Sequence, residues 1–151
     1  SPEPPGALET AGGIVQALSL LGEEPFLVIN GDVYCDWDVG RAPALALGED
    51  QAHLVLVPNP PQHPEGDFAL ADGRVTDAGT PRHTFAGIGL YRPALFAGLV
   101  AGQPAKLAPL LRQAMARGQV GGELYRGRWE DVGTPARLQA LDAELGGAAR
   151  V

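Results

Sequence analysis

The chain has 151 residues, 45% of them hydrophobic, and its 11 basic and 18 acidic residues give a formal net charge of −7. This length fits one domain with a buried core, and an acidic chain without a basic run is poorly suited to binding nucleic acid. No apolar run approaches the ~20 residues that cross a bilayer. Cys35 is the single cysteine, which excludes an internal disulfide and suits a reducing, cytoplasmic environment.

The first half of the chain predicts one long helix, two buried strands and a short helix. Apolar residues recur with helical spacing from Leu8 to Leu21. The pair Gly12-Gly13 weakens the start of this helix and would suit a backbone that approaches a ligand closely. Phe26–Asn30 and His53–Val57 are short apolar runs typical of buried strands, and we expect a short helix at 42–47 between them.

The second half of the chain predicts a hairpin, two further extended segments and two helices. Asp72-Gly73 is the hairpin turn, and Thr84–Tyr91 is a strand. Lys106–Arg117 has an amphipathic helical pattern, whereas Val120–Trp129 is extended structure interrupted by two glycines. Thr134-Pro135 starts the final helix. Because strands and helices alternate, we expect an α/β fold with a mainly parallel sheet and a hairpin insertion.

Asp32 follows the first predicted strand directly, in the turn Asn30-Gly31-Asp32. Open α/β sheets bind ligands at the carboxyl ends of their strands. A carboxylate at that position is well placed to hold a hard cation such as Mg²⁺, which prefers oxygen ligands. The alternative is that this aspartate only caps the following turn.

The segment Trp129–Thr134 repeats the pattern, since an extended segment again ends in an acid and a glycine. Asp131 and Asp32 could therefore converge at one sheet edge, where two carboxylates and phosphate oxygens would complete a Mg²⁺ shell. The helix that begins at Thr134 also presents free N–H groups to an anion. Considered without Asp32, Asp131 more simply caps this helix.

Several segments together resemble the sugar-1-phosphate nucleotidyltransferases, the NDP-sugar pyrophosphorylases. The four that carry the resemblance are Leu8-Glu-Thr-Ala-Gly-Gly13, Val28-Ile-Asn-Gly-Asp32, Phe85-Ala-Gly-Ile88 and Trp129-Glu-Asp-Val-Gly-Thr134. Two others, Lys106–Met115 and Tyr125–Trp129, resemble the branch of this family that acts in bacterial cell-wall (peptidoglycan) recycling. The resemblance covers nearly the whole chain.

The resemblance implies a Rossmann-like, GT-A-like fold and transfer of a nucleotidyl group from an NTP to a sugar-1-phosphate with release of pyrophosphate. In the branch named above, the NTP is UTP and the sugar is N-acetylmuramate 1-phosphate. The resemblance also implies that Asp32 and Asp131 are catalytic and hold Mg²⁺. Residues implicated in nucleotide binding are Glu9, Thr10, Gly12 and Gly31, and those implicated near the sugar are Gly66, Asp67 and Gly87, with Lys106 as a possible cation.

Three of these assignments have simpler alternatives. Gly66 and Gly87 could serve turn formation alone, and Lys106 could extend its charge into solvent from a helix start. Many family members carry a Glu-Lys-Pro motif before the strand at Thr84. The corresponding stretch here is Thr76–Pro81, so the contacts of that motif do not transfer.

The family opens with a strand and a Gly-x-Gly-x-Arg loop followed by a phosphate-binding lysine, and this sequence has no such segment. We therefore expect residues 1–151 to be the later two-thirds of a single nucleotidyltransferase domain. Because removing one preorganised electrostatic partner typically costs ~10²–10³ in rate, we expect the chain alone to be inactive or nearly so. A missing strand would also leave an unpaired sheet edge that could support self-association.

Two other functions stay open. Asp36-Trp-Asp38 is formally an Asp-x-Asp motif, as in metal-dependent glycosyltransferases of related architecture, although these acids more simply cap the helix near Ala42. A non-catalytic regulatory module with a nucleotidyltransferase-like fold is the second alternative. Retention of both Asp32 and Asp131 argues against that module.

Overall fold

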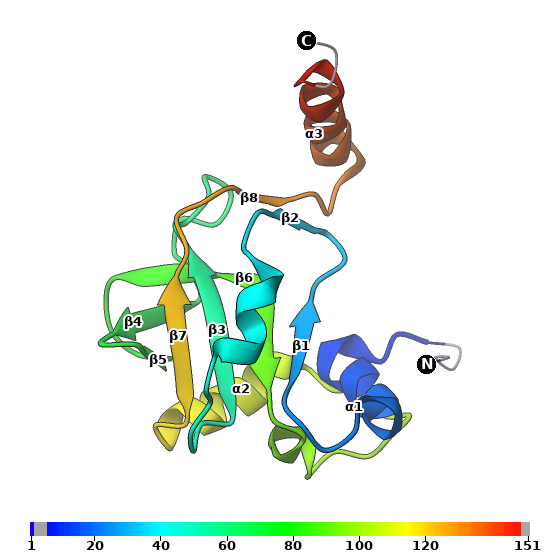
Figure 1. The fold of residues 1–151 in the computed structure, drawn as a ribbon, viewed down its shortest axis with the longest axis vertical. Coiled ribbons are helices and arrows are strands. Elements are labelled where there is room, and N and C mark those ends of the chain that lie inside the picture. Colours follow the sequence, from blue (N-terminus) through cyan, green and yellow to red (C-terminus); the bar gives the residue numbers. More distant parts are fainter. Residues whose placement is uncertain (2–5, 149–151) are drawn as a thin grey trace.

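The computed structural model describes residues 1 and 6–148, which form one mixed sheet with helices on both faces and a projecting C-terminal helix (Figure 1). In chain order the elements are α1 (Glu9–Leu21), β1 (Phe26–Ile29), β2 (Val33–Cys35), the 3₁₀ helix η1 (Val39–Ala44), β3 (Ala52–Val57), β4 (Phe68–Ala71), β5 (Arg74–Thr76), β6 (Arg82–Tyr91), the 3₁₀ helix η2 (Pro93–Phe96), α2 (Leu107–Ala116), β7 (Val120–Leu124), β8 (Trp129–Asp131) and α3 (Pro135–Ala148).

The main sheet has the order β1-β6-β3-β7-β5-β4. Strands β1, β3 and β7 run in the same direction, because β1 and β3 are both antiparallel to β6 and β3 is parallel to β7. The expected α/β class is confirmed, but most neighbouring strands pair antiparallel. The reason lies in the connection from β3 to β6, which is the hairpin β4–β5 instead of a crossover helix, so β6 returns beside β3 antiparallel.

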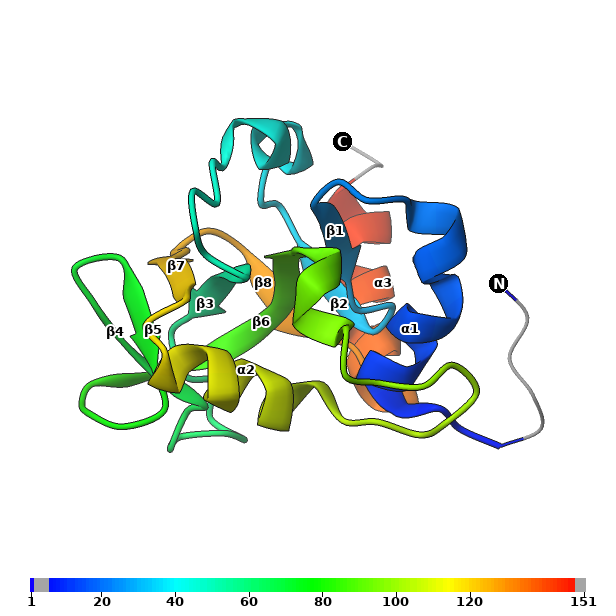
Figure 2. The same cartoon turned by 90° about the horizontal axis from the view of Figure 1, so that it is seen from below.

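The core lies on both faces of β3. Helices α1 and α2 cover one face (Figure 2), where Leu54 and Leu56 are fully buried. On the same face the rings of Phe26, Tyr91 and Phe96 lie 6.0–6.4 Å apart, a separation typical of favourable aromatic pairs. Residues around η1 cover the other face. A strand buried on both faces needs a continuous apolar run, which explains the composition of 52–57.

Strand β7 continues through Gly121 and Gly122, where the sequence predicted an interruption. A methyl group at Gly122 would lie 2.4 Å from Val75 Cγ2 and 2.8 Å from the Leu54 carbonyl oxygen. The glycine therefore lets β5 and β3 approach β7 closely.

The short helix predicted at 42–47 is the 3₁₀ helix η1, which begins and ends three residues earlier. Asp38 sets its start, because its side-chain Oδ1 accepts a hydrogen bond from Gly40 N at 2.9 Å. At the other end of the segment, Leu45 has already returned to an extended conformation. Capping by Asp38 is thus confirmed.

Strand β1 pairs with β6 alone among the described strands, so it lies at an edge of the sheet. The described sheet thus has β1 as an edge strand, while a missing neighbouring strand and self-association through this edge stay predictions. The edge strand is only four residues long, and a short edge is less prone to unwanted pairing than a long one. No helix in the described residues is long and apolar enough to cross a bilayer.

Beyond the ends of β1 and β7, the chain forms the β2–β8 ribbon, from which α3 projects away from the sheet (Figure 1). In this ribbon Val33 is opposite Asp131, and Val132 N donates a hydrogen bond to the Asp32 carbonyl at 2.8 Å. Two segments about 100 residues apart in sequence are thereby fixed side by side. This pairing determines where the two predicted metal ligands lie.

Candidate functional site

The carboxylates of Asp32 and Asp131 converge on the same small space beside Gly133. A methyl group at Gly133 would lie 3.0 Å from Asp131 Oδ1 and 3.2 Å from Asp32 Oδ2. The absence of a side chain at Gly133 therefore leaves a cradle between two acidic oxygens. The predicted convergence of the two aspartates is a feature of the structure, and their role as metal ligands stays a prediction.

The cradle suits a cation that takes part of its coordination from a substrate. The described residues contain no cluster of three or more His, Cys, Asp or Glu side chains that could hold a metal ion by themselves. Mg²⁺ usually keeps several waters and is bound through one or two carboxylates together with phosphate oxygens. Two carboxylate oxygens around an open space thus fit Mg²⁺ better than a metal that needs a full protein cage.

Asp131 is held in its ionised form by its neighbours. Its Oδ1 accepts a hydrogen bond from Gly133 N at 2.8 Å, and its Oδ2 accepts one from the Arg137 guanidinium. The Gly133 hydrogen bond, followed by the Arg137 contacts, holds the pKa of this carboxyl below its ordinary value. The cap of α3 is instead Thr134, whose hydroxyl accepts from Arg137 N at 3.3 Å, so helix capping does not account for Asp131.

A cavity of about 220 Å³ opens onto both aspartates. Its walls come from the end of β1, the loop after β3, strand β6 and the ribbon. The lining residues include Gly87 as well as Asn30, His63, Phe85 and Trp129.

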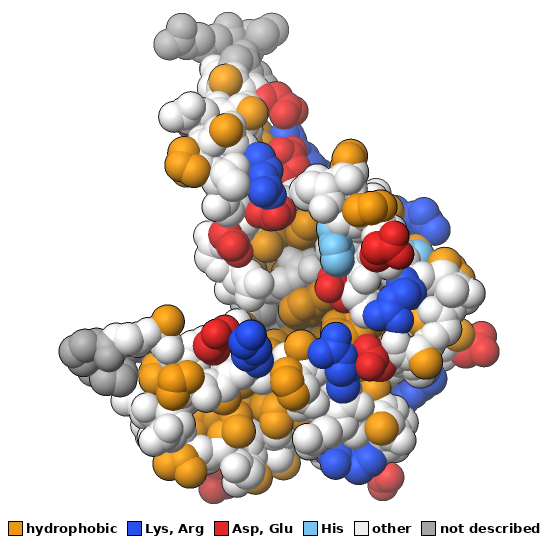
Figure 3. All heavy atoms as spheres, turned by 180° about the vertical axis from the view of Figure 1, so that it is seen from behind, with side chains coloured by type: hydrophobic (Ala, Val, Ile, Leu, Met, Phe, Trp, Pro, Cys, Tyr) orange, Lys and Arg blue, Asp and Glu red, His pale blue; other side chains and the backbone are white. Residues whose placement is uncertain are grey.

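A second cavity of about 350 Å³ adjoins the first, since Asn30 and Phe85 line both. It contains four of the other predicted site residues, namely Glu9, Thr10, Asp67 and Lys106. Glu9 and Thr10 come from the first turn of α1, and Lys106 from the residue before α2. Figure 3 shows this hollowed face, with acidic and basic side chains around the hollow. The two cavities thus form one cleft in two parts. Seven of the residues predicted from the resemblance line it, three in the first cavity and four in the second.

Glu9 has a strained backbone at the edge of the second cavity. Its φ of 59° is in the left-handed region, which costs a non-glycine residue on the order of 1–3 kcal/mol. The strain accompanies the tight join between α1 and the segment before α2, where Ala11 N donates to the Ala105 carbonyl at 2.9 Å. Such strain clusters at ligand sites, in keeping with the predicted nucleotide contact of Glu9.

The structure gives packing reasons for two of the predicted glycines. A methyl group at Gly12 would lie 2.6 Å from the Gln103 carbonyl oxygen, so the close backbone approach at Gly12 is to the chain itself. Gly66 has a φ of 65°, and a methyl group there would lie 2.7 Å from Asn59 Oδ1. Gly31 has open space around it. Ligand contacts of these three glycines stay predictions.

Gly87 combines a backbone role with a place in the first cavity. It has a φ of 73° and lies where the β3–β6 register shifts between Val55 and Leu56, a bulge in β6. A methyl group there would lie 2.9 Å from the Asn30 amide nitrogen. The backbone conformation alone is therefore enough to explain a glycine at position 87. Gly87 nevertheless also lines the first cavity.

Asp67 anchors the loop 58–66 to β6. Its Oδ2 accepts a hydrogen bond from Phe85 N at 2.8 Å, and its Oδ1 lies 3.1 Å from His63 Nε2. Both carboxylate oxygens thus have protein partners. The predicted sugar-binding aspartate also determines where His63 stands at the cavity.

Sequence reasoning did not single out Asn30, His63 and Phe85, which line the cleft, or Arg137, which contacts Asp131 and lines a neighbouring cavity. Asn30 and Phe85 both belong to segments that carry the resemblance, and this membership was the available signal. His63 lies in a proline-rich loop that offered no periodic signal. Arg137 is the third residue of α3 and lies six positions after Asp131, so its contact with the acid depends on the turn between β8 and α3.

The Asp-x-Asp alternative loses its support. Asp38 caps η1, and Asp36 Oδ1 accepts the Tyr125 hydroxyl at 2.6 Å. Neither acid lines the cleft. Both carboxylates have structural partners instead.

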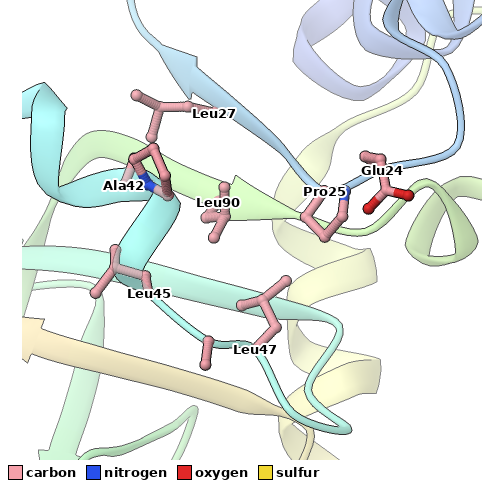
Figure 4. Close-up of a pocket in the computed structure, with 9 residues that line it drawn as sticks. Glu24, Pro25, Leu27, Ala42, Leu45, Leu47 and Leu90 are labelled. Carbon is pink, nitrogen blue, oxygen red and sulfur yellow. The ribbon is translucent and has the colours of Figure 1, made fainter.

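A cavity larger than either part of this cleft lies apart from it. It has a volume of about 480 Å³ and lies between η1 and the sheet, where Glu24 is the one charged residue in an apolar lining (Figure 4). The residues labelled there include Leu27, Leu45, Leu47 and Leu90. None of the predicted site residues lines it, so size alone does not identify the functional site.

The chain is similar over most of its length to two curated relatives. It is 51% identical over 152 residues to the N-acetylmuramate alpha-1-phosphate uridylyltransferase of Neisseria meningitidis serogroup B, covering 97% of this chain and 66% of the relative. It is 35% identical to the protein of the same name from Caulobacter vibrioides, covering 92% of this chain and 62% of that relative. The chain thus spans somewhat less than two thirds of the length of these relatives. No family model matches the chain.

Solved structures share its fold at low sequence identity. The inositol-1-phosphate CTP transferase of T. maritima matches with a TM-score of 0.70 and 16% identity, over 91% of this chain and 61% of that one. HddC from Yersinia pseudotuberculosis, complexed with GMP-PN, matches with a TM-score of 0.70 and 17% identity, over 94% of this chain and 64% of that one. These structures show the shared fold alone, and the identity to the two sequence relatives shows that the chain belongs to the sugar-1-phosphate nucleotidyltransferase family.

Proposed function

We propose that the protein containing this chain transfers a uridylyl group from UTP to N-acetylmuramate 1-phosphate, with release of pyrophosphate. The single observation that carries the proposal is the pair Asp32 and Asp131, which face one cradle beside a cleft lined by Glu9, Thr10 and Lys106. The choice of UTP and of this sugar rests on the named relatives. The same relatives support a role in cell-wall recycling, and the single cysteine favours a cytoplasmic location.

In this proposal Asp32 and Asp131 would hold Mg²⁺ with their carboxylates. A bound Mg²⁺ would neutralise charge on the phosphates and orient them. Supporting this assignment, the Gly133 N–H fixes the rotamer of Asp131. The ribbon pairing fixes the backbone of Asp32 relative to it.

The remaining cleft residues bind and orient the two substrates. We assign the nucleotide to the cavity beside α1, where Glu9 and Thr10 can accept and donate hydrogen bonds. Lys106, at the mouth of the same cavity, supplies a positive charge for a phosphate. The sugar is assigned to the part of the cleft where the two cavities adjoin, since Gly87 lines the first cavity, and Asp67 lines the second and holds the loop 58–66 in place.

The reaction needs no general base from the protein. The attacking oxygen belongs to a phosphate that is already anionic at neutral pH, and it displaces pyrophosphate from the α-phosphorus of the NTP. Catalysis is therefore positioning together with charge neutralisation. The acidic residues of the cleft accordingly act as ligands and anchors, not as proton acceptors.

Pyrophosphate release from UTP, Mg²⁺ and N-acetylmuramate 1-phosphate tests the proposal. The assay uses this chain alone and this chain joined to the N-terminal segment of a family member. Activity that disappears with Asp32→Asn is the expected result for the joined protein. The matched control is Asp72→Asn in the exposed β4–β5 turn, where φ is 48° and asparagine is equally well tolerated. A folded joined protein without activity would contradict the proposal.

A further inference from the structure

Arg137 occupies the second oxygen of the proposed metal ligand Asp131. Its Nη1 donates to Asp131 Oδ2 and, at 3.3 Å, to the Asp131 carbonyl oxygen. The other carboxylate oxygen, Oδ1, faces the cradle that it shares with Asp32. The Arg137 guanidinium thus neutralises one of the two carboxylates of the cradle, at the place where a divalent cation would add its own positive charge.

The Arg137–Asp131 pair is open to solvent on one side. The two side chains are 41% and 35% exposed, and ion pairs at this exposure contribute little net stability. Arg137 also borders a cavity of about 290 Å³ between the loop 60–62 and α3, with Trp129 and Asp131 in its lining. The guanidinium therefore has room to leave Asp131 without disturbing the packing of α3.

We propose that a divalent cation and Arg137 exchange at Asp131, and that the released Arg137 then binds a phosphate anion beside the cation. The inference rests on the proposed function, since it requires that Asp131 bind the cation. A guanidinium recognises phosphate oxygens through two parallel hydrogen bonds, and the two cavities that flank Asp131 place such an anion within its reach. Without the cation, Arg137 thus neutralises the charge of Asp131. With the cation bound, it becomes a ligand of the phosphate.

The exchange predicts opposite effects of one substitution on two ligands. With Mn²⁺ as the probe, Arg137→Met removes the competing charge, so Mn²⁺ alone should bind about two- to fivefold more tightly. With Mn²⁺ saturating, inorganic phosphate should bind at least about tenfold more weakly to the same variant, because the loss of a charge-assisted contact is costly. Arg137→Lys keeps the positive charge but loses the pair of parallel N–H donors. Its affinities for Mn²⁺ and for phosphate should therefore lie between those of the wild type and of Arg137→Met.

The titrations follow free Mn²⁺ by electron paramagnetic resonance and phosphate by calorimetry, with circular dichroism as a check of folding. Arg117→Met, at the distant end of α2, is the matched control and should behave as the wild type. Weaker Mn²⁺ binding by Arg137→Met would show that Arg137 only holds Asp131 in place, which overturns the exchange. Unchanged phosphate binding would overturn the second half of the proposal. If the wild type binds Mn²⁺ no better than Asp32→Asn, the metal site and the exchange both fail.

Discussion

The sheet body and the ribbon edge of this molecule are held together in different ways. In the sheet body, formed by β3, β6 and β7 with α1 and α2, side chains such as Leu54 and Leu56 are fully buried. In the ribbon edge, formed by β2, β8 and the first turn of α3, every strand residue is only half-buried. Cys35 and Trp129 pack against the core, and the other contacts include hydrogen bonds and ion pairs. The body supplies stability, and the edge supplies open, charged groups for ligands.

This difference predicts that substitutions in the body unfold the protein, whereas substitutions at the edge change binding with little effect on stability. Burial on both faces of a strand leaves no room for adjustment. Solvent-exposed pairs, in contrast, can be replaced by water. Four experiments can sharpen or break the contrast.

The largest effect is expected from Leu54→Ala in β3. Leu54 is fully buried, and removing such a side chain typically lowers the free energy of unfolding by about 2–5 kcal/mol. Urea unfolding measures the loss. The matched control is Leu20→Ala on α1, whose side chain is 74% exposed and should change stability by less than about 0.5 kcal/mol. Equal losses in both variants would remove the distinction between body and surface.

Gly122→Ala should destabilise the body by a smaller amount, about 1–3 kcal/mol. The added methyl would lie 2.8 Å from the Leu54 carbonyl oxygen, a backbone atom that cannot turn aside. The melting temperature of this variant is compared with that of the control Gly98→Ala, where the added methyl would meet open space. A wild-type melting temperature for Gly122→Ala would contradict the close approach of β3, β5 and β7.

At the ribbon edge, Gly133→Ala should weaken Mn²⁺ binding at least about tenfold while leaving the fold intact. The methyl would lie between the two carboxylate oxygens and would exclude a cation and its waters from the cradle. Gly146→Ala on α3, where a methyl meets open space, is the control. Undiminished Mn²⁺ binding with a folded Gly133→Ala protein would place the cation elsewhere.

The smallest effect concerns the pH dependence of stability at Asp131. Because the folded-state pKa of this carboxyl is lowered, the ionised group stabilises the fold above its unfolded pKa of about 3.9, and the contribution is lost as pH falls through the folded value. Asp131→Asn should therefore melt slightly below the wild type at pH 7. The difference should shrink as pH falls through the lowered pKa of Asp131 in the folded protein. A difference in melting temperature that is larger at low pH than at pH 7 would contradict stabilisation by the ionised Asp131.

The two regions also differ in how much of them the sequence predicts. The continuous apolar run of β3, the Asp72-Gly73 hairpin and the helical pattern of α2 each reflect a local regularity, and all three elements form where expected. The sheet direction was predicted less well, because the placement of β6 between β1 and β3 depends on pairing across the chain. The two glycines of β7, Gly121 and Gly122, could not be interpreted from the sequence for the same reason. They are explained by contacts with β3 and with the β4–β5 hairpin.

For the cleft, the sequence predicts the residues that lie inside short motifs. Asp32 and Asp131 each follow an extended segment, and that local pattern suffices to place both at a sheet edge. Arg137 and His63 could not be predicted in the same way. Arg137 contacts Asp131 across the turn between β8 and α3, and His63 contacts Asp67, which in turn is bound to Phe85 N of β6. The contacts of Arg137 and His63 span only six and four residues, but the turn and the loop that form them have no periodic pattern in the sequence.

The most direct test of the central claim is a double-mutant cycle on Mn²⁺ binding with Asp32→Asn, Asp131→Asn and the double variant. If both carboxylates hold one cation, each single substitution should weaken binding by at least about tenfold, and the double variant should be little worse than either, since the two sites are coupled. Additive losses, or wild-type affinity in either single variant, would contradict a shared site and with it the proposed catalytic role of this cleft.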